Sequence, residues 1–376
     1  MCHACLIIAA AVAGAAVLWT VPVSASPVRS ASFSCALANS PIELSICSDE
    51  KTSSADGAMA AAYGDALAKV SPNGRLALRD SQRAFLRYVA DLCRPGGRPL
   101  DADRNPFRWT IQAQPSDSVL VSQCLAQQFE KRAAYLRVSV LPVGGHMFLV
   151  TEYHRVRAAA PVQVGALTVH DVVTETKSLI QIDAPKSEAE VNWNQASQDW
   201  LDDTMDSPNS ETENHNFEAE ELDVDARMEL VSASPDVIVV QMGVSTYWKG
   251  RPHPQWQREA RIWSLPLGRR LAPSDFLDAD KPWDRALTAV AQANLKSTVD
   301  PPNNTFLGKI ASIDNIDHWR LTPAGIEIVF DPYELGGYLS AAKSLLPWSE
   351  VRPYLRRDAP FDPASLREPP TPPEKP

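Results

Sequence analysis

Four cysteines in the first third of the chain constrain its fold more than any other feature. They are Cys35, Cys47, Cys93 and Cys124, at successive spacings of 12, 46 and 31 residues. Zinc sites usually place paired cysteines about two to four residues apart, or beside histidines, so metal binding is disfavoured. An even number of clustered cysteines in an exported protein indicates disulfides, and the residues alone leave three pairings open.

The N-terminus supports export. Residues 4–25 are almost entirely apolar and end in small residues, which is the pattern of a secretory signal cleaved near Ala25. The segment before the apolar run has His3 but no Lys or Arg, and the run is long enough to span a membrane, so an uncleaved anchor is the alternative. Cys2 and Cys5 both lie within the predicted signal, residues 1–25. We expect a periplasmic or secreted protein, with no membrane contact after cleavage.

Size and charge bound the remaining possibilities. A chain of 376 residues exceeds what one hydrophobic core usually fills, so we expect two domains. The formal net charge of −10 argues against nucleic-acid binding, which needs clustered Lys and Arg. An acidic surface attracts basic partners, although the charge also has a simpler explanation in solubility.

Residues 32–138 have helical patterns. Ser71 and Pro72 form a helix start, with serine as the N-cap and proline at the first helical position. The segment that follows places Leu78, Phe85 and Val89 near one face. These patterns predict a small all-α helical bundle.

Residues 143–357 predict an α+β domain with a mainly antiparallel sheet. Short β-branched or aromatic runs predict strands, and two longer periodic segments, 192–205 and 282–298, predict helices. Residues 199–225 contain eleven acidic residues and no Lys or Arg. That run is either a solvated insertion or a docking surface for a cationic partner. The proline-rich tail 358–376 is predicted to be unstructured.

The sequence gives no positive sign of catalysis. It contains no nucleophile elbow, no metalloprotease helix, no phosphate-binding loop and no dinucleotide fingerprint. The seven histidines include no pair three or four residues apart, so we expect no metal site and no cofactor. We predict no catalytic residue and expect a protein that is not an enzyme.

Two longer patterns resemble known families. The first resembles the LprI lysozyme-inhibitor family over residues 32–138, through a cysteine pattern joined to helix motifs in the same order. The matching residues are Cys35, Glu43, Cys47, Asp49, Tyr63, Gln82, Arg83, Phe85, Cys93 and Cys124. This resemblance implies a disulfide-bonded helical bundle, and with export it implies the pairs Cys35–Cys47 and Cys93–Cys124. The interpretation of Arg83 is structural, as an ion pair or a hydrogen bond to a helix end.

The second pattern resembles the lysozyme-binding C-terminal domain of the anti-sigma factor RsiV, over about 235–356. The motif residues that carry it, and that we take as candidate binding residues, are Tyr247, Gly250, His253, Asp331, Pro332, Tyr333 and Tyr338. The anti-sigma factor needs a cytoplasmic sigma-binding segment and a membrane helix, and we expect neither after the predicted signal, so transcriptional regulation is not implied. Each motif also has a plain structural interpretation, such as a turn at Pro332 or an exposed loop at His253.

Both resemblances imply the same kind of function. We expect an exported, non-enzymatic protein that binds lysozyme-like muramidases and inhibits them. The alternatives are an envelope enzyme or accessory module acting on peptidoglycan or another polysaccharide, and a structural envelope protein. The oligomeric state stays open.

Overall fold

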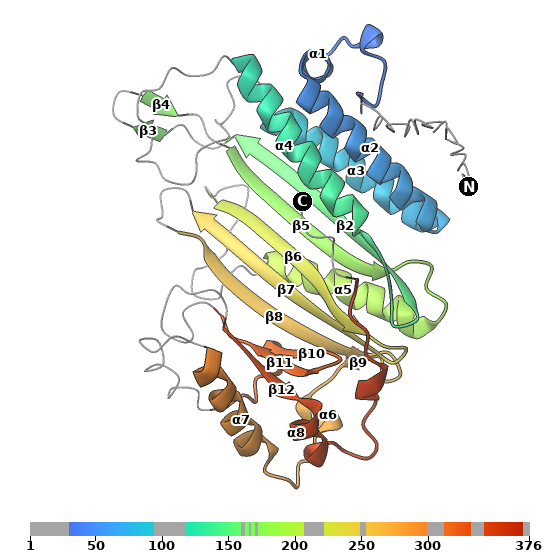
Figure 1. Cartoon of the computed structure of the whole chain (residues 1–376), viewed down its shortest axis with the longest axis vertical. Helices are drawn as coiled ribbons and strands as arrows, with labels where there is room; N and C mark the ends of the chain where they lie inside the picture. The colour runs from blue at the N-terminus through green and yellow to red at the C-terminus, as the bar shows by residue number, and fades with distance from the viewer. Residues whose placement is uncertain are drawn as a thin grey trace, which may run out of the picture.

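A computed structural model of the chain describes residues 30–93, 117–158, 162–164, 167–169, 172–206, 222–248, 253–298, 312–331 and 342–370. The predicted signal 1–25 and the motif residues Gly250, Pro332, Tyr333 and Tyr338 lie outside these ranges. In chain order the structure consists of a helical bundle, a seven-stranded sheet and a smaller three-stranded sheet (Figure 1). The predicted fold class, a disulfide-bonded helical bundle followed by an α+β region, is confirmed.

The bundle consists of four helices with polar residues at their starts. They are α1 (Pro41–Ser48), α2 (Glu50–Lys69), α3 (Pro72–Leu92) and α4 (Asp117–Arg137). Ser40 caps α1, Asp49 accepts from the backbone N–H of Thr52 in α2, and Ser71 accepts from the backbone N–H of Gly74 in α3. These contacts satisfy backbone donors that have no partner within the helix. The start of α3 is therefore where the Ser71–Pro72 pair predicts it.

Two disulfides tie the bundle together. Cys35–Cys47 joins a short 3-10 helix, Cys35–Leu37, to α1, and Cys93–Cys124 joins the end of α3 to α4. These are the pairs that the first family resemblance implies. Between them, small buried alanines of α2 pack against α4, so the two helices lie close together.

The large sheet has the order β1-β2-β5-β6-β7-β8-β9. Its strands are β1 (Val140–Val143), β2 (His146–Ala158), β5 (Val172–Ile182), β6 (Leu222–Ala233), β7 (Val237–Trp248), β8 (Gln255–Ser264) and β9 (Arg269–Arg270). The strand pairs are antiparallel except β5–β6, which is parallel and is connected through α5 (Glu188–Asp206). A parallel pair requires such a crossover. Between β2 and β5 in the chain lies a hairpin of β3 (Val162–Val164) and β4 (Leu167–Val169).

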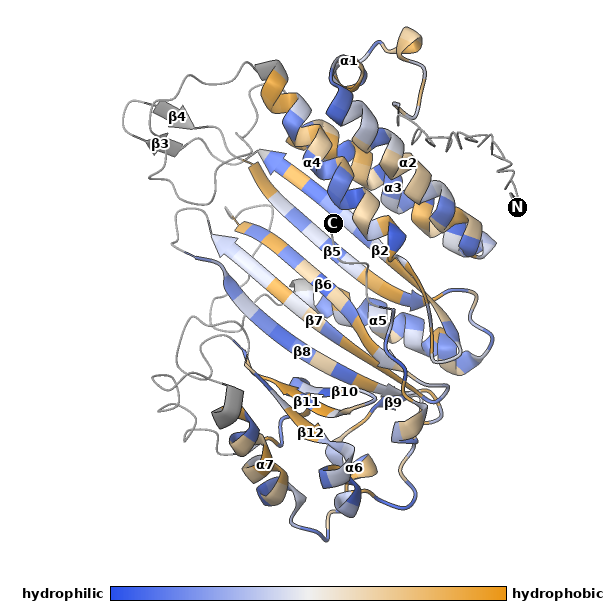
Figure 2. Ribbon diagram, in the orientation of Figure 1, coloured by the Kyte–Doolittle hydropathy of each residue, from blue (hydrophilic) through white to orange (hydrophobic). Residues whose placement is uncertain are grey.

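Hydrophobic layers cover both faces of this sheet. The helix α5 packs on one face through Trp193 and Trp200, which are buried with alternate residues of β6 and β7. On the other face, Val237 and Val239 of β7 pack in a second cluster together with Trp319. The elements of that cluster are β10 (Trp319–Leu321), β11 (Gly325–Val329), β12 (Lys343–Pro347), α6 (Pro273–Phe276), α7 (Trp283–Thr298) and α8 (Trp348–Val351). Figure 2 shows apolar residues alternating with polar ones along these strands.

The bundle packs along the edge of the large sheet. β1 pairs with β2 only over residues 146–149 of β2, and α3 lies beside the continuation of β2 (Figure 1). The Ser81 hydroxyl donates to the carbonyl oxygen of Glu152 at 2.6 Å, and the Glu152 N–H donates back at 3.3 Å. An uncovered strand edge invites pairing with other chains, so the bundle protects this one.

Two predictions need correction. The acidic run 199–225 is not a loop at its ends, because 199–206 belong to α5 and 222–225 begin β6; residues 207–221 lie outside the described ranges. The tail is ordered over 358–370, because Phe361 and Leu366 are buried in the core and Arg367 bridges to Ala233. Buried apolar contacts of this kind outweigh a proline-rich composition.

Candidate functional site

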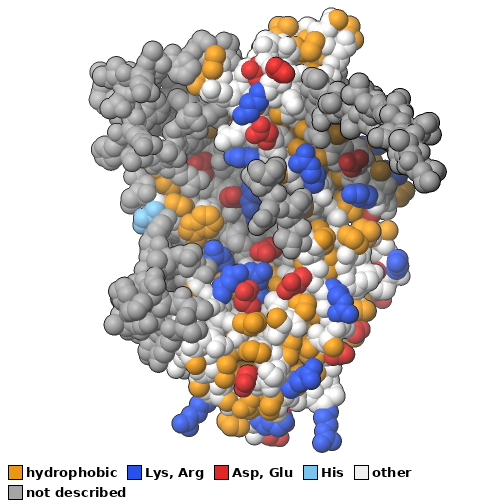
Figure 3. Space-filling view, in the orientation of Figure 1, with side chains coloured by type: hydrophobic (Ala, Val, Ile, Leu, Met, Phe, Trp, Pro, Cys, Tyr) orange, Lys and Arg blue, Asp and Glu red, His pale blue; other side chains and the backbone are white. Residues whose placement is uncertain are grey.

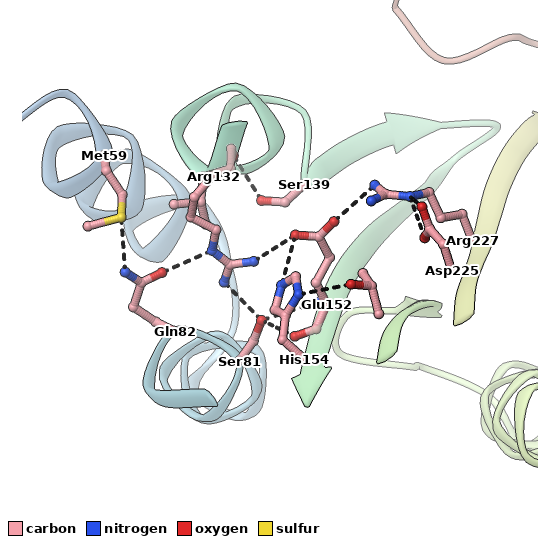
Figure 4. A network of polar contacts seen from close by, with 11 residues as sticks. Met59, Ser81, Gln82, Arg132, Ser139, Glu152, His154, Asp225 and Arg227 are labelled. Carbon is pink, nitrogen blue, oxygen red and sulfur yellow. Dashed lines mark hydrogen bonds and ion pairs between the residues drawn. The ribbon is translucent and has the colours of Figure 1, made fainter. Parts of the chain in front are cut away.

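The most buried charged residue in the described structure, Arg132, lies where the bundle meets the sheet. Arg132, from the apolar side of α4, is fully buried, and its three guanidinium nitrogens all have partners (Figure 4). Nη1 donates to Oε2 of Glu152 at 3.0 Å, Nη2 to the Ser81 hydroxyl at 2.9 Å, and Nε to Oε1 of Gln82 at 3.1 Å. Gln82 in turn donates to the sulfur of Met59 at 3.5 Å. Three helices and one strand therefore meet at a single guanidinium.

Glu152 connects this cluster to the interior of the sheet. Its Oε1 accepts from Nη1 of Arg227 on β6 at 3.2 Å, and its Oε2 lies 3.5 Å from Nε2 of His154 (Figure 4). Burial by itself would raise the pKa of Glu152. The contact with His154 and the charges of Arg132 and Arg227 outweigh burial and hold that pKa below its ordinary value. The carboxylate is thus ionised and shared by cations from two parts of the fold.

Aromatic rings seal the cluster from solvent. The Arg132 guanidinium lies 5.2 Å from the centroid of Phe85 and 5.4 Å from that of Tyr135, both within cation–π range. Tyr88 stacks against His154 at 5.0 Å, and burial raises the pKa of Tyr88 to about 12. Arg132 and Glu152 are buried in this packing, so the cluster fixes the bundle to the sheet.

Of the residues that contact Arg132, the family pattern in the sequence includes Gln82 and Phe85 but not Ser81 or Glu152, and it does not include Arg132 itself. Gln82 is a candidate residue from the family pattern, whereas its neighbour Arg83 lies on the surface with Asp80 at 3.5 Å. Arg132 and Glu152 are new. A signal for Arg132 was present in the sequence, because it is a charged residue between Phe129 and Leu136 on the apolar side of its helix. No signal in the sequence joins it to Glu152.

Glu43, another candidate, stabilises the start of α1. Its Oε2 accepts from the backbone N–H groups of Ser40 and Asn39 at 3.0 and 3.1 Å, and Ser40 accepts from the Glu43 N–H. These donors lower the pKa of the Glu43 carboxyl. The pair is a capping box, so this residue acts on local structure.

The residues of the second resemblance are distributed over both sheets. Tyr247 lies one residue before the end of β7, and His253 is exposed just before β8. Asp331 follows β11 in the smaller sheet. The structure therefore brings Tyr247 and His253 to one strand connection. Trp256, which pairs with Ser245 beside Tyr247, is partly exposed at the same place.

The exposed side of α5 is acidic in its C-terminal half. The helix α5 has six carboxylates and no Lys or Arg, and Asp199, Asp202 and Asp203 are exposed in its C-terminal half. Acidic residues near a helix C-terminus oppose the helix dipole, although Asp199 and Asp202 accept hydrogen bonds from Gln195 and Gln198 one turn earlier. In the space-filling view, acidic, basic and apolar side chains are interspersed (Figure 3).

A pocket of about 350 Å³ lies between α5 and strands β2 and β5. Tyr153, Glu175 and Asp202 are among its lining residues. Glu175 is held by Arg155 at 3.2 Å and by Lys177 at 2.8 Å. The carboxylate of Glu175 is therefore paired with two cations. The pocket has charged side chains both on the strands and, through Asp202, on α5.

Within the described ranges, no group of three or more His, Cys, Asp or Glu side chains is placed to hold a metal ion. The helices of the described part of the chain include none that is both long and apolar enough to cross a bilayer.

Comparison with known proteins gives one family match. Residues 35–136, roughly a quarter of the chain, match the model of the family described as lysozyme inhibitor LprI. This is the segment of the bundle and both disulfides. No curated protein matches the chain.

Two solved structures of the DUF3298 family are similar to part of the chain. One, from Bacteroides fragilis, is 12% identical with a TM-score of 0.38, and covers 57% of this chain and 95% of its own. The other, from Pseudomonas aeruginosa, is 11% identical with a TM-score of 0.42, and covers 57% and 97%. These similarities are too weak to carry an inference. The resemblance to the RsiV domain stays a prediction.

Proposed function

We propose that this chain is an exported, non-enzymatic protein that binds lysozyme-like muramidases and inhibits them by surface complementarity. The observation that carries the proposal is the match of residues 35–136 to the lysozyme inhibitor LprI family, on a segment that folds as a bundle closed by two disulfides. Disulfides persist in oxidising compartments such as the periplasm, where a muramidase would be encountered.

Electrostatics favour a basic partner. The net charge is −10, and the exposed carboxylates of α5 concentrate negative charge on one side of the sheet. Complementary charge raises the rate of encounter and suppresses wrong partners. A basic muramidase is therefore attracted to this protein over distances that depend on salt.

The buried cluster around Arg132 favours a preformed binding surface. It fixes the bundle to the sheet edge through Ser81, Glu152 and Arg227. Association costs less when the interacting surfaces need no reordering. The bundle can then bind a folded enzyme without a rearrangement of its own.

An accessory module that binds peptidoglycan is the alternative. The observation in its favour is the pocket beside α5, where Tyr153 and several polar groups meet in a space of about 350 Å³. The ion pairs of Glu175 make binding of a sugar fragment more compatible with this pocket than cleavage. Incubation with labelled peptidoglycan tests it, because retention of label without product supports binding and absence of both removes the alternative.

Inhibition is tested with protein lacking the first 25 residues. Added to egg-white lysozyme, it should slow the clearing of a peptidoglycan suspension in proportion to its concentration. The matched control is the same protein after reduction and alkylation, which should lose the effect because the bundle depends on its disulfides. An unchanged clearing rate at a molar excess of the native protein would refute inhibition.

A further inference from the structure

An apolar projection stands at the free end of the bundle. Residues 35–47, closed by the Cys35–Cys47 disulfide, are called the disulfide-closed tip below. Leu37 is 77% exposed, the highest value among the large apolar side chains that the structure describes, and Leu44 is 53% exposed. Figure 2 shows this apolar turn beside α1 at the end of the bundle farthest from the small sheet. Both side chains project into solvent and contribute little to the core.

The tip is held rigidly. The disulfide fixes its two ends, and the capping box between Ser40 and Glu43 fixes the turn between them. On its inner side, Ile46 is buried in the bundle core, with Ile42 packed against that core. A preordered segment loses little conformational entropy when its outer side chains are covered by a partner.

The surroundings of the tip are acidic. From Ser30 to Glu50 the sequence contains three carboxylates and no Lys or Arg. A depression of about 650 Å³ adjoins α1 at the start of α2, with Asp49, Glu50 and Glu130 in its lining. Its one lysine, Lys51, lies 3.8 Å from Glu130. An apolar centre with a negatively charged rim suits a basic protein that presents an apolar hollow.

We propose that the disulfide-closed tip is the element that docks on the muramidase, with Leu37 and Leu44 entering a concave apolar region of the enzyme. The carboxylates around the tip then face basic side chains at the rim of that region. This inference rests on the proposed function and names the part of the chain that performs it. Buried apolar anchors surrounded by a polar rim supply most of the affinity in protein interfaces.

The test is the double variant L37A/L44A. Its matched control is L76A/L86A, which removes two leucines of α3 that are 56% and 46% exposed on the same bundle. Titration calorimetry with egg-white lysozyme at low salt should show the affinity of the tip variant falling at least about tenfold, with the control within about twofold of wild type. Both variants should unfold at the wild-type temperature, because neither change touches a buried residue.

The outcomes separate the two proposals. If wild type binds and the tip variant binds equally well, the tip does not dock and the proposed function stands. If wild type shows no binding, both proposals fall. Sedimentation with phosphatidylglycerol vesicles is the third arm, because the same leucines suit a lipid surface. Vesicle binding that is lost in L37A/L44A, with lysozyme affinity unchanged, would assign the tip to a membrane and overturn this inference.

Discussion

Arg132 and Glu152 show how one residue pair joins two parts of a fold. Both are buried, and their atoms reach α2, α3, α4, β2 and β6 through direct contacts or one intermediate side chain. A buried ion pair is weak evidence for stability as a whole, because desolvation offsets the attraction. Removing one partner alone is strongly destabilising, because the other partner is then left as a buried, uncompensated charge.

The first prediction concerns Arg132→Met. We expect the free energy of unfolding to fall by about 3–5 kcal/mol, because Glu152 would lose a buried partner while Ser81 and Gln82 lost a donor. Urea denaturation of the protein lacking its first 25 residues measures this. Arg137→Met, an exposed change on the same helix, should cost less than about 0.5 kcal/mol. Equal effects of the two changes would contradict the role of the cluster.

The second prediction concerns pH. The pKa of Glu152 is lower in the folded protein than the ordinary glutamate value of 4.5, so the contribution of this carboxylate to stability is present above pH 4.5. That contribution is lost as pH falls through the folded pKa, because the folded state must then take up a proton. Glu152→Gln should therefore be less stable than wild type at neutral pH, and the difference should shrink on acidification. A difference in unfolding free energy that stays constant from neutral to acidic pH would be inconsistent with an ionised Glu152.

At the scale of the element, the disulfides make the bundle possible. They close segments with sequence separations of 12 and 31 residues. We expect Cys93→Ala combined with Cys124→Ala, or Cys35→Ala combined with Cys47→Ala, to cost about 3–4 kcal/mol each from the greater entropy of the unfolded chain. Denaturation of each variant, compared with wild type under non-reducing conditions, measures the cost. Free thiols in native wild type, detected by mass spectrometry, would contradict the pairing itself.

The C-terminal segment provides the next element-scale prediction. Leu366 is fully buried against the sheet, whereas Leu345 of β12 is 40% exposed. Leu366→Ala should lower stability by about 2–5 kcal/mol through the cavity it leaves. Leu345→Ala, the matched control, should cost less than about 1 kcal/mol. Thermal and urea unfolding distinguish the two. If Leu366→Ala left the free energy of unfolding unchanged, residues 358–370 would not belong to the core.

Local signals in the sequence predicted the elements that depend on local structure. The start of α3 lies at Ser71–Pro72, where the capping pattern predicts it, and β7 and β8 lie in the region 143–357 for which short β-branched or aromatic runs predict strands. The start of strand β6 lies inside the acidic run 199–225, because half-buried Asp223 and Asp225 alternate there with buried apolar residues. The acidic composition of this stretch made the alternation of apolar and polar residues, which is typical of a strand, harder to recognise.

Capping, periodicity and composition patterns are local, so they cannot predict contacts between residues that are far apart in the sequence. Ser81 and Glu152 are 71 residues apart, and Ala233 bridges to Arg367 across the chain. The proline-rich composition of the tail gave no sign that Phe361 would be covered by the core. At the candidate site, the sequence identified Gln82 through a family pattern, but only the fold places Arg132 and Glu152 beside it.

At the scale of the whole molecule, one hypothesis, binding of a basic muramidase, uses the bundle, the sheet edge and the net charge together. The bundle carries the family match and the exposed tip, and the buried cluster holds it against a sheet that carries the acidic helix α5 on one face. Because charge attraction is screened by salt, complex formation with a basic enzyme should weaken as ionic strength rises.

The most direct measurement is calorimetric titration of the protein lacking its first 25 residues with egg-white lysozyme, at low and at high salt. We expect saturable binding with a dissociation constant of about 1 μM or below at low salt. We expect the affinity to fall at least about tenfold when salt is raised from about 0.01 M to about 0.15 M, because the Debye length then shortens from about 30 Å to about 8 Å. Absence of binding heat at low salt, together with separate elution of the two proteins in gel filtration, would contradict the proposed function.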